Sequence, residues 1–345
     1  MVTSALSGAD GGATAAVTTW QGWDAFVQQP QRAVLPADDP SWLQADREDY
    51  HCELAVMRTP SMDSVFTSVR RLLLLNRHQR AGARRGLIIS GPATTGKTTT
   101  MMALGRSFQL SDRRRHPDHG ERRPVLFTSV PPAATPKMLV SEFARFLGMP
   151  LADRLNQTQI TNAVCDLLCE LGTQLVLVDD VHLLDTRRRV GAETSDQLKY
   201  LAERIPATFV YSAIDIEAAS LLHGVRGAQL AGRFKIFHHR PLPYATTQDK
   251  AVWDALVSGM EQLLRLRAHR PGSLLKHAAY LHTRTAGRIG SLSHLIREAA
   301  LIALAEGTEA ITKQLLSEVE LDAAAEALSR PARTAQRTGG TPVAP

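Results

Sequence analysis

Residues 86–102 read GLIISGPATTGKTTTMM. The segment opens with a short apolar run, turns through GPATTGKT, and continues into a stretch that favours a helix. GPATTGKT at 91–98 matches the phosphate-binding pattern G-x-x-x-x-G-K-[ST] at every fixed position, in the strand–loop–helix context that the pattern needs. The stretch therefore predicts a P-loop nucleotide-binding fold.

Each part of this loop has a chemical task. Gly91 and Gly96 allow the backbone to curl, so that successive N–H groups converge on phosphates at the positive end of the next helix. Lys97 is placed to reach the β- and γ-phosphates of ATP, and the Thr98 hydroxyl is placed to ligate Mg²⁺. We expect nucleotide contacts along the whole loop, which comprises Gly91, Pro92, Ala93, Thr94, Thr95, Gly96, Lys97, Thr98 and Thr99. The loop itself does not indicate which base is bound.

A second apolar run, LVLVDD, ends in Asp179 and Asp180. An acid at a strand tip beside a P-loop orients Mg²⁺ through its water shell, and its neighbour can polarise the attacking water. We assign Asp179 to the metal and Asp180 to the water; a solvated pair at a strand end is the alternative. At the end of the run ATFVYSA, Ser212 or the nearby Asp215 is expected to contact the γ-phosphate or the attacking water.

Five short apolar runs follow one another from Gly86: GLIIS, PVLFTSV, QLVLVDD, ATFVYSA and FKIFHHR. Helical patterns separate most of them, and this alternation is typical of a parallel sheet covered on both faces. After Pro243 the pattern predicts only helices, at 246–269, 272–286, 291–305 and 312–328. The expected fold class is α/β, a five-stranded parallel sheet with a C-terminal helical lid.

The flanks of this core have a different composition. The expected divisions are disordered tails at 1–19 and 329–345, a helical arm at 20–85, the α/β core at 86–242 and the lid at 243–328. The N-terminal arm is interrupted by prolines, and its last part carries Val65, Val69, Leu72 and Leu73 at helical spacing.

The 345 residues are 44% hydrophobic and 21% charged, which is ordinary for a globular protein. No apolar stretch is long enough to span a membrane, and the first residues do not resemble a signal peptide. The three cysteines lack metal-ligand spacing, and their odd count does not favour a disulfide framework. We therefore expect a cytoplasmic protein without a membrane partner.

Two arginines are candidates for sensing the γ-phosphate. Arg233 directly precedes FKIF, where an arginine commonly faces the nucleotide of the next subunit, and Arg226 is its nearby competitor. Arg288 lies in TAGRIGSLSHLIREAA at the start of a predicted lid helix. A merely solvated arginine is the alternative at both positions.

With these residues in place, the chain resembles the AAA+ ATPases, and within them the TniB/TnsC family of transposon-encoded ATPases. The resemblance covers about 57–324. It depends on MRTPSM, on GLIISGPATTGKTTT, on VLVDDVHLL with LKYLAERIPATFVY after it, on the pair Arg233–Phe234, and on TAGRIGSLSHLIREAA.

The resemblance implies rings or filaments of the chain around double-stranded DNA in the ATP state, contact with a DDE transposase, and a role in target selection, with a target-selector protein as a further partner. It implies that Arg233 is the arginine finger, Arg288 the sensor-2 arginine and Ser212 approximately the sensor-1 residue. One departure is that Asp180 replaces the usual glutamate. Its shorter side chain favours slow hydrolysis or a switch driven by binding.

Arginines gather in three runs. The first spans 70–85, the second includes Arg113–Arg115, and the third is Arg187–Arg189. Solvated faces are the alternative, but three runs in one chain favour phosphate contacts, and the scarcity of aromatic residues favours duplex over single strands. We therefore assign DNA contacts to Arg113, Arg114, Arg115, Arg187, Arg188 and Arg189.

The leading hypothesis is a DNA-binding AAA+ ATPase that regulates transposition. A nucleotide-gated DNA-binding scaffold with little hydrolysis is the second. An AAA+ replication initiator or helicase loader is less favoured, because few residues follow the last predicted helix, too few for a winged-helix domain. A signalling ATPase of the STAND type is disfavoured because no repeat array follows the core.

Overall fold

The computed structural model describes residues 15–30, 42–53, 55–79, 84–118, 120–150, 155–217 and 219–329. Residues 1–14 and 330–345, which make up most of the two predicted tails, lie outside these ranges. The chain forms two compact units. The first comprises Met1–Ala33, Arg58–Pro92 and Gly96–Arg240, and the second comprises Val34–Met57, Ala93–Thr95 and Pro241–Pro345.

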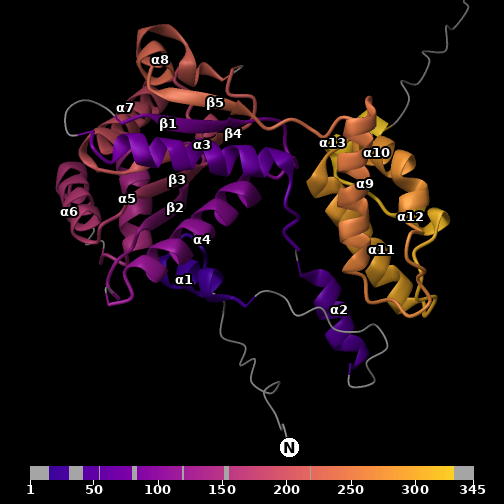
Figure 1. The fold of residues 1–345 in the computed structure, drawn as a ribbon. Helices are drawn as coiled ribbons and strands as arrows, with labels where there is room; N and C mark the ends of the chain where they lie inside the picture. Colours follow the sequence, from indigo (N-terminus) through magenta and orange to yellow (C-terminus); the bar gives the residue numbers. More distant parts are fainter. Residues whose placement is uncertain are drawn as a thin grey trace, which may run out of the picture. The chain divides into compact units, whose positions relative to one another are not determined.

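The first unit is built on a parallel five-stranded sheet in the order β2-β3-β4-β1-β5 (Figure 1). Its strands are β1 (Gly86–Ser90), β2 (Val125–Ser129), β3 (Leu175–Asp179), β4 (Thr208–Ala213) and β5 (Phe234–His238). All five predicted strands are present, and the α/β fold class is confirmed. Because β4 lies between β1 and β3, the P-loop strand and the strand that ends in Asp179 are not direct neighbours.

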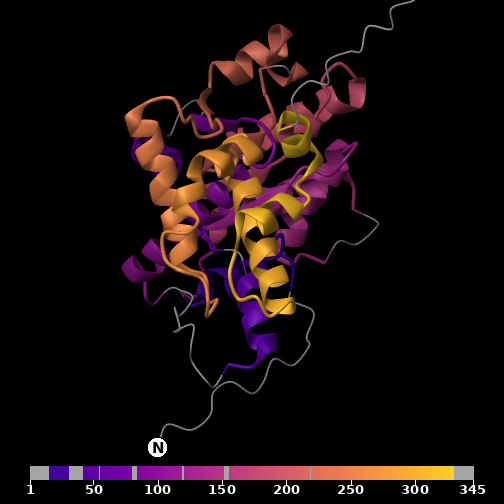
Figure 2. The same ribbon diagram turned by 90° about the vertical axis from the view of Figure 1, so that its right-hand side faces the viewer.

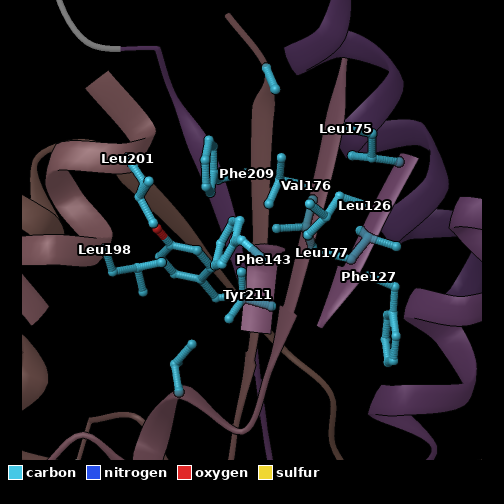
Figure 3. Close-up of a cluster of buried hydrophobic side chains, with 14 of the residues drawn as sticks. Leu126, Phe127, Phe143, Leu175, Val176, Leu177, Leu198, Leu201, Phe209 and Tyr211 are labelled. Atoms are coloured by element: carbon cyan, nitrogen blue, oxygen red, sulfur yellow. The ribbon is translucent and has the colours of Figure 1, made fainter. Parts of the chain in front are cut away.

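The strands are apolar because both faces of the sheet are covered. The side chains of β1, β3 and β4 are buried along their whole length. In Figure 3, Tyr211 of β4 lies among Leu198, Leu201 and Phe143. Burial of this kind stabilises by about 25 cal/mol per Å² of apolar surface, so the core dominates the stability of the unit.

Helices pack on both faces of the sheet. The helices of this unit are α1 (Trp20–Gln28), α3 (Pro60–Asn76), α4 (Lys97–Arg115), α5 (Pro136–Leu147), α6 (Gln157–Glu170), α7 (Arg189–Arg204) and α8 (Gly224–Ala231), with short 3₁₀ turns η1 (Val181–Leu183) and η2 (Ser220–Leu222). Helices α3 and α4 contact the sheet on one side, whereas α5 packs with α6 and α7 on the other. Of the predicted apolar stripe of α3, Val65, Val69 and Leu72 are buried, and Leu73 is partly buried against the same core.

Helix α1 is anchored to the rest of the first unit by Trp23, which is fully buried. Its ring stacks on Phe127 with 5.6 Å between ring centroids, and its Nε1 donates to Gln109 Oε1 over 2.7 Å. A Cβ at position 105 of α4 would lie 2.7 Å from the Trp23 ring, so Gly105 makes room for the indole. The first helix of the predicted arm is therefore part of the first unit.

The second unit is helical. It contains α2 (Gln44–Cys52), α9 (Thr247–Gln262), η3 (Leu275–His277), α10 (Ala278–Thr285), α11 (Ile289–Ala305), α12 (Lys313–Glu318) and α13 (Ala323–Ser329). Figure 2 shows α9 to α13, coloured orange to yellow, gathered into a bundle. Their shared core is buried around Trp253, Leu292 and Leu295.

Helix α2 belongs to this unit although it precedes α3 in the sequence. Arg47 of α2 is 4% exposed, and its two terminal nitrogens donate to the Glu309 carboxylate over 2.5 and 2.6 Å. The Arg47 Nη2 also donates to the backbone carbonyl of Arg265. Residues 20–85 therefore divide between the two units.

The predicted helix at 312–328 is wrong as one element, because it breaks at Val319 and restarts at Ala323. Asp322 accepts from the Ala325 backbone N–H, and so its side chain caps a new helix instead of continuing the old one. The predicted helix at 246–269 ends at Gln262, and that at 272–286 is helical only from 275.

In the described ranges, no helix is both long enough and apolar enough to cross a membrane.

Candidate functional site

The P-loop has the backbone that its glycines predict. Gly96 has φ 93°, in the left-handed region, and directly precedes α4. A Cβ on Gly91 would lie 2.1 Å from the carbonyl oxygen of His239, so only glycine fits there. Thr94, at the tip of the loop, also has a positive φ of 60°. The loop therefore delivers its N–H groups to the start of a 19-residue helix, the arrangement that binds phosphate.

The predicted magnesium ligands come together. Thr98 Oγ1 donates to Asp179 Oδ2 over 2.6 Å, from α4 to the last residue of β3. Asp179 is buried at 3% exposure, and Ser129 of β2 pairs with it in register. A hydroxyl and a carboxylate oxygen are hard donors of the kind that Mg²⁺ binds, so these two residues fit the ion. Lys97 is buried too, and its Nζ donates to the Pro92 carbonyl over 2.6 Å.

Asp180 has an unusual backbone. Its φ of 57° and ψ of 34° are left-handed, a region that aspartate tolerates better than most residues. Burial, together with the neighbouring Asp179 carboxylate, raises the pKa of Asp180. Its side chain is 48% exposed, and His182 Nδ1 lies 4.0 Å from its Oδ1. The carboxylate is thus accessible to water at the edge of the sheet that carries the P-loop.

Ser212 lies inside β4, in register with Ile89 of β1. It is fully buried, and its Oγ has no hydrogen-bond partner among the described residues. A buried hydroxyl without a partner is costly, so this group is suited to a ligand or water molecule. The competing residue, Asp215, is exposed beyond the end of the strand with φ 39°.

Arg233 precedes β5, at the edge of the sheet where the strands begin. Its side chain is 29% exposed, and its Nη1 donates to Glu203 Oε1 of α7 over 2.5 Å. The side chain of its competitor Arg226 lies outside the described part of the chain. The predicted arginine finger therefore has an acidic partner within the same chain.

Arg288 directly precedes α11 in the second unit, at the predicted helix start, and its side chain makes no capping hydrogen bond. Its Nε and Nη1 are buried and have no hydrogen-bond partner among the residues that the structure describes. A guanidinium with unused donors is chemically suited to phosphate.

Arg187 and Arg188 directly precede α7, and Arg189 is its first residue, so the run follows the sheet edge at which the P-loop also emerges. Their side chains are 82%, 84% and 89% exposed. Asp185 pairs with the first two, and Glu193 with the third. Exposed pairs of this kind contribute little to stability, so the guanidinium groups remain available to an external anion.

Arg113–Arg115 occupy the last turn of α4, which runs back from the P-loop to the opposite edge of the sheet. Arg113 pairs with Asp24 of α1, and Arg115 donates to Ser111. Arg122 of the same region pairs with Asp112. Two of the predicted DNA-binding runs thus lie at opposite ends of the sheet, and the second run is partly engaged in holding α1.

Sequence reasoning missed His239. It follows β5 and is 5% exposed, with its carbonyl beside Gly91 and its Nε2 3.3 Å from Thr100 Oγ1 in α4. The available signal was a pair of histidines after the last apolar run, FKIFHH, which is weak by itself.

The fold that carries this site recurs in proteins of known structure. The Aeropyrum pernix ORC2 protein in ADPNP and ADP complexes matches with a TM-score of 0.60 and 17% identity, over 77% of this chain and 69% of that one. Drosophila ORC bound to DNA matches with a TM-score of 0.55 and 16% identity, over 84% and 68%. Domain III of the Thermotoga maritima replication initiation protein DnaA matches with a TM-score of 0.50 and 14% identity, over 82% and 98%. At these identities the likeness concerns the fold, which is that of AAA+ proteins.

In sequence, no curated protein gives a significant match. The family described as "Bacterial TniB protein" matches residues 50–243, more than half of the chain. The matched segment contains the P-loop, Asp179, Asp180 and Arg233, and it ends before most of the second unit. With an AAA+ fold and this match, the chain belongs to the TniB family.

Proposed function

We propose that this protein is an ATPase that binds double-stranded DNA as an ATP-dependent ring or filament, and that it regulates target selection and recruits a DDE transposase in DNA transposition. The observation that carries the nucleotide part is the 2.6 Å contact between Thr98 Oγ1 and Asp179 Oδ2 beside a glycine-shaped P-loop. The TniB family supports the transposition part.

In this proposal the P-loop amides and Lys97 bind the phosphates of ATP. Thr98 and Asp179 would hold Mg²⁺, which supplies charge neutralisation at the β- and γ-phosphates. Asp180 orients the attacking water and accepts its proton, Ser212 hydrogen-bonds near the γ-phosphate, and Arg233 and Arg288 stabilise the negative charge that develops there.

Of the basic runs, Arg187–Arg189 are the best placed to contact DNA phosphates. Arg187–Arg189 are highly exposed and follow the strand that ends in the Mg²⁺ ligand, so a change at the nucleotide has a short route to them through β3 and η1. Repetition of a weak contact in every subunit of an assembly would add up to firm binding. Arg113–Arg115 lie in the last turn of α4 at the other edge, and Arg113 is paired with Asp24, so this run contributes less to DNA binding than Arg187–Arg189.

The test is duplex binding measured by anisotropy with ATP, ADP and no nucleotide, together with steady-state hydrolysis. We expect binding only with ATP and little preference among sequences. Equal affinity in the three nucleotide conditions would contradict a nucleotide-gated assembly, and no binding at low salt would remove DNA from the function.

A second function is favoured by one observation, the short side chain of Asp180 on a left-handed backbone. A weak water-activating group would make the protein a nucleotide-gated scaffold with little hydrolysis. A hydrolysis rate that stays at background with duplex and ATP, while ATP still drives DNA binding, would identify this second function.

A further inference from the structure

His239 extends the pairing of β5 with β1 by one residue. Its backbone N–H donates to the Ser90 carbonyl over 2.6 Å, immediately before the P-loop starts. Its own carbonyl occupies the space that a Cβ of Gly91 would need. The backbone of His239 therefore supports the point at which the chain leaves β1 and enters the loop.

The His239 ring reaches the other end of the same loop. Its Nε2 lies 3.3 Å from Thr100 Oγ1, in the first turn of α4. Both side chains are buried, His239 at 5% exposure and Thr100 at 1%. The second ring nitrogen, Nδ1, has no hydrogen-bond partner in the described ranges, so the contact with Thr100 is the polar anchor of the ring there.

The charge state of this ring is fixed by its surroundings. Burial lowers the pKa of His239 to about 4, and the Lys97 ammonium contributes in the same direction. At neutral pH the imidazole is therefore neutral beside the lysine. A neutral ring can brace the helix without competing with Lys97 for the phosphates.

We propose that His239 is a positioning residue for nucleotide binding, which rests on the proposed ATPase function. Through its carbonyl it fixes Gly91, and through its ring it fixes the first turn of α4. The loop between these two points then presents Lys97 and Thr98 in the geometry that phosphate and Mg²⁺ require. Removal of the ring's hydrogen bond loosens the loop without removing any group that touches ATP.

The experiment compares two replacements of His239 by the affinity for a fluorescent ATP analogue. His239→Leu keeps the ring's apolar bulk but not its hydrogen bond, and should weaken nucleotide binding about tenfold. His239→Gln places a neutral amide within reach of Thr100, and should stay within about threefold of the unmodified protein. His238→Gln is the matched control, because that neighbouring side chain is 52% exposed and pairs with Glu217 instead; it should change nothing.

Thr100→Val provides a milder second variant in case His239→Leu does not fold. It should weaken nucleotide binding by a similar factor, and the double variant with His239→Leu should be no weaker than either single variant, because both remove the same hydrogen bond. Melting temperatures report whether the fold is retained. Rescue by glutamine is the readout that a pure packing role would not give.

Normal nucleotide affinity in both His239→Leu and Thr100→Val would overturn the positioning role while leaving the proposed function intact. An equal loss in His239→Leu and His239→Gln would also overturn it, since packing alone would then explain the effect. If the unmodified protein binds no nucleotide, it is the proposed function that fails.

Discussion

The guanidinium of Arg233 is held by Glu203 of the same subunit, with 2.5 Å between Nη1 and Oε1. The side chains are 29% and 40% exposed, so the pair is accessible at the surface and is not locked by burial. An arginine that serves a neighbouring active site must leave this carboxylate. If Arg233 acts on a neighbour's nucleotide, as we propose, Glu203 would compete with that nucleotide for the guanidinium.

Arg233→Ala should lower ATP hydrolysis at least tenfold in the assembled protein, with little change in nucleotide affinity. Mixing it with Lys97→Ala, which retains Arg233 but lacks the P-loop ammonium, should partly restore hydrolysis at shared interfaces. Glu203→Gln should leave hydrolysis unchanged or raise it. Activity of Arg233→Ala that equals the unmodified protein at every concentration would show that this arginine does not act across subunits.

Lys97→Ala should abolish ATP hydrolysis and weaken ATP binding, because it removes a buried ammonium at the phosphate-binding loop. Hydrolysis measured by phosphate release is the readout, and the melting temperature is the control for folding. Turnover like that of the unmodified protein would contradict the assignment of the P-loop.

Asp180→Asn should slow hydrolysis by two orders of magnitude or more and retain ATP affinity, so that the ATP-bound assembly accumulates. Asparagine is a matched change because it also tolerates the left-handed backbone, at φ 57°. Asp180→Glu extends the carboxylate by one methylene but adapts less well to that backbone. A faster rate for Asp180→Glu would show that reach limits catalysis. Hydrolysis by Asp180→Asn at the normal rate would show that another residue activates the water, with Glu193 as the next candidate.

Neutralising Arg187–Arg189 to glutamine should weaken ATP-dependent duplex binding and flatten its salt dependence. For each DNA phosphate that the variant no longer neutralises, the slope of log K against log salt should decrease by about 0.9. The same change at Arg113–Arg115 is the comparison, because that run lies at the opposite sheet edge and Arg113 is paired with Asp24. Anisotropy across a salt series measures both. A larger loss of DNA affinity on neutralising Arg113–Arg115 than on neutralising Arg187–Arg189 would place the main DNA-binding surface at Arg113–Arg115 instead.

His239 predicts a pH dependence of stability. Its pKa is lowered from 6.5 to about 4 on folding, so the unfolded chain takes up a proton first as the pH falls. The contribution of the neutral ring is complete above about pH 6.5 and is lost between there and pH 4, by about 2 kcal/mol at pH 5. His239→Gln should lack this loss. Urea unfolding of both proteins at pH 7 and pH 5 gives the difference, and parallel pH profiles would contradict the buried neutral imidazole.

The features that could be predicted from the sequence are those with a local cause. The P-loop could be recognised because each fixed position of its pattern has its own task in phosphate binding. Strands β1 and β3 could be recognised because buried parallel strands need continuous apolar runs. Asp179 and Thr98 followed from these two motifs, although 81 residues separate them.

What could not be predicted depends on partners far along the chain. Arg113 belongs to a basic run that favours DNA contact, yet its partner Asp24 lies 89 residues away. The break in the last predicted helix depends on a hydrogen bond in which the Asp322 side chain accepts from the Ala325 backbone N–H. The spacing of apolar residues does not predict this bond. The left-handed backbone of Asp180 likewise could not be predicted, because the only sequence signal for it is that the residue is an aspartate.

The pairing of Arg47 with Glu309 gives the chain an unusual order of assembly during synthesis. Arg47 leaves the ribosome early, and its carboxylate partner follows 262 residues later. At a translation rate of about 5–20 residues per second, roughly 13 to 50 s pass between the synthesis of Arg47 in α2 and that of Glu309. The P-loop sheet can fold during that interval, whereas the second unit cannot close until the last part of the chain has been made. A nascent chain stalled before Glu309 should therefore protect the sheet from proteolysis and leave the segment around Arg47 open to cleavage.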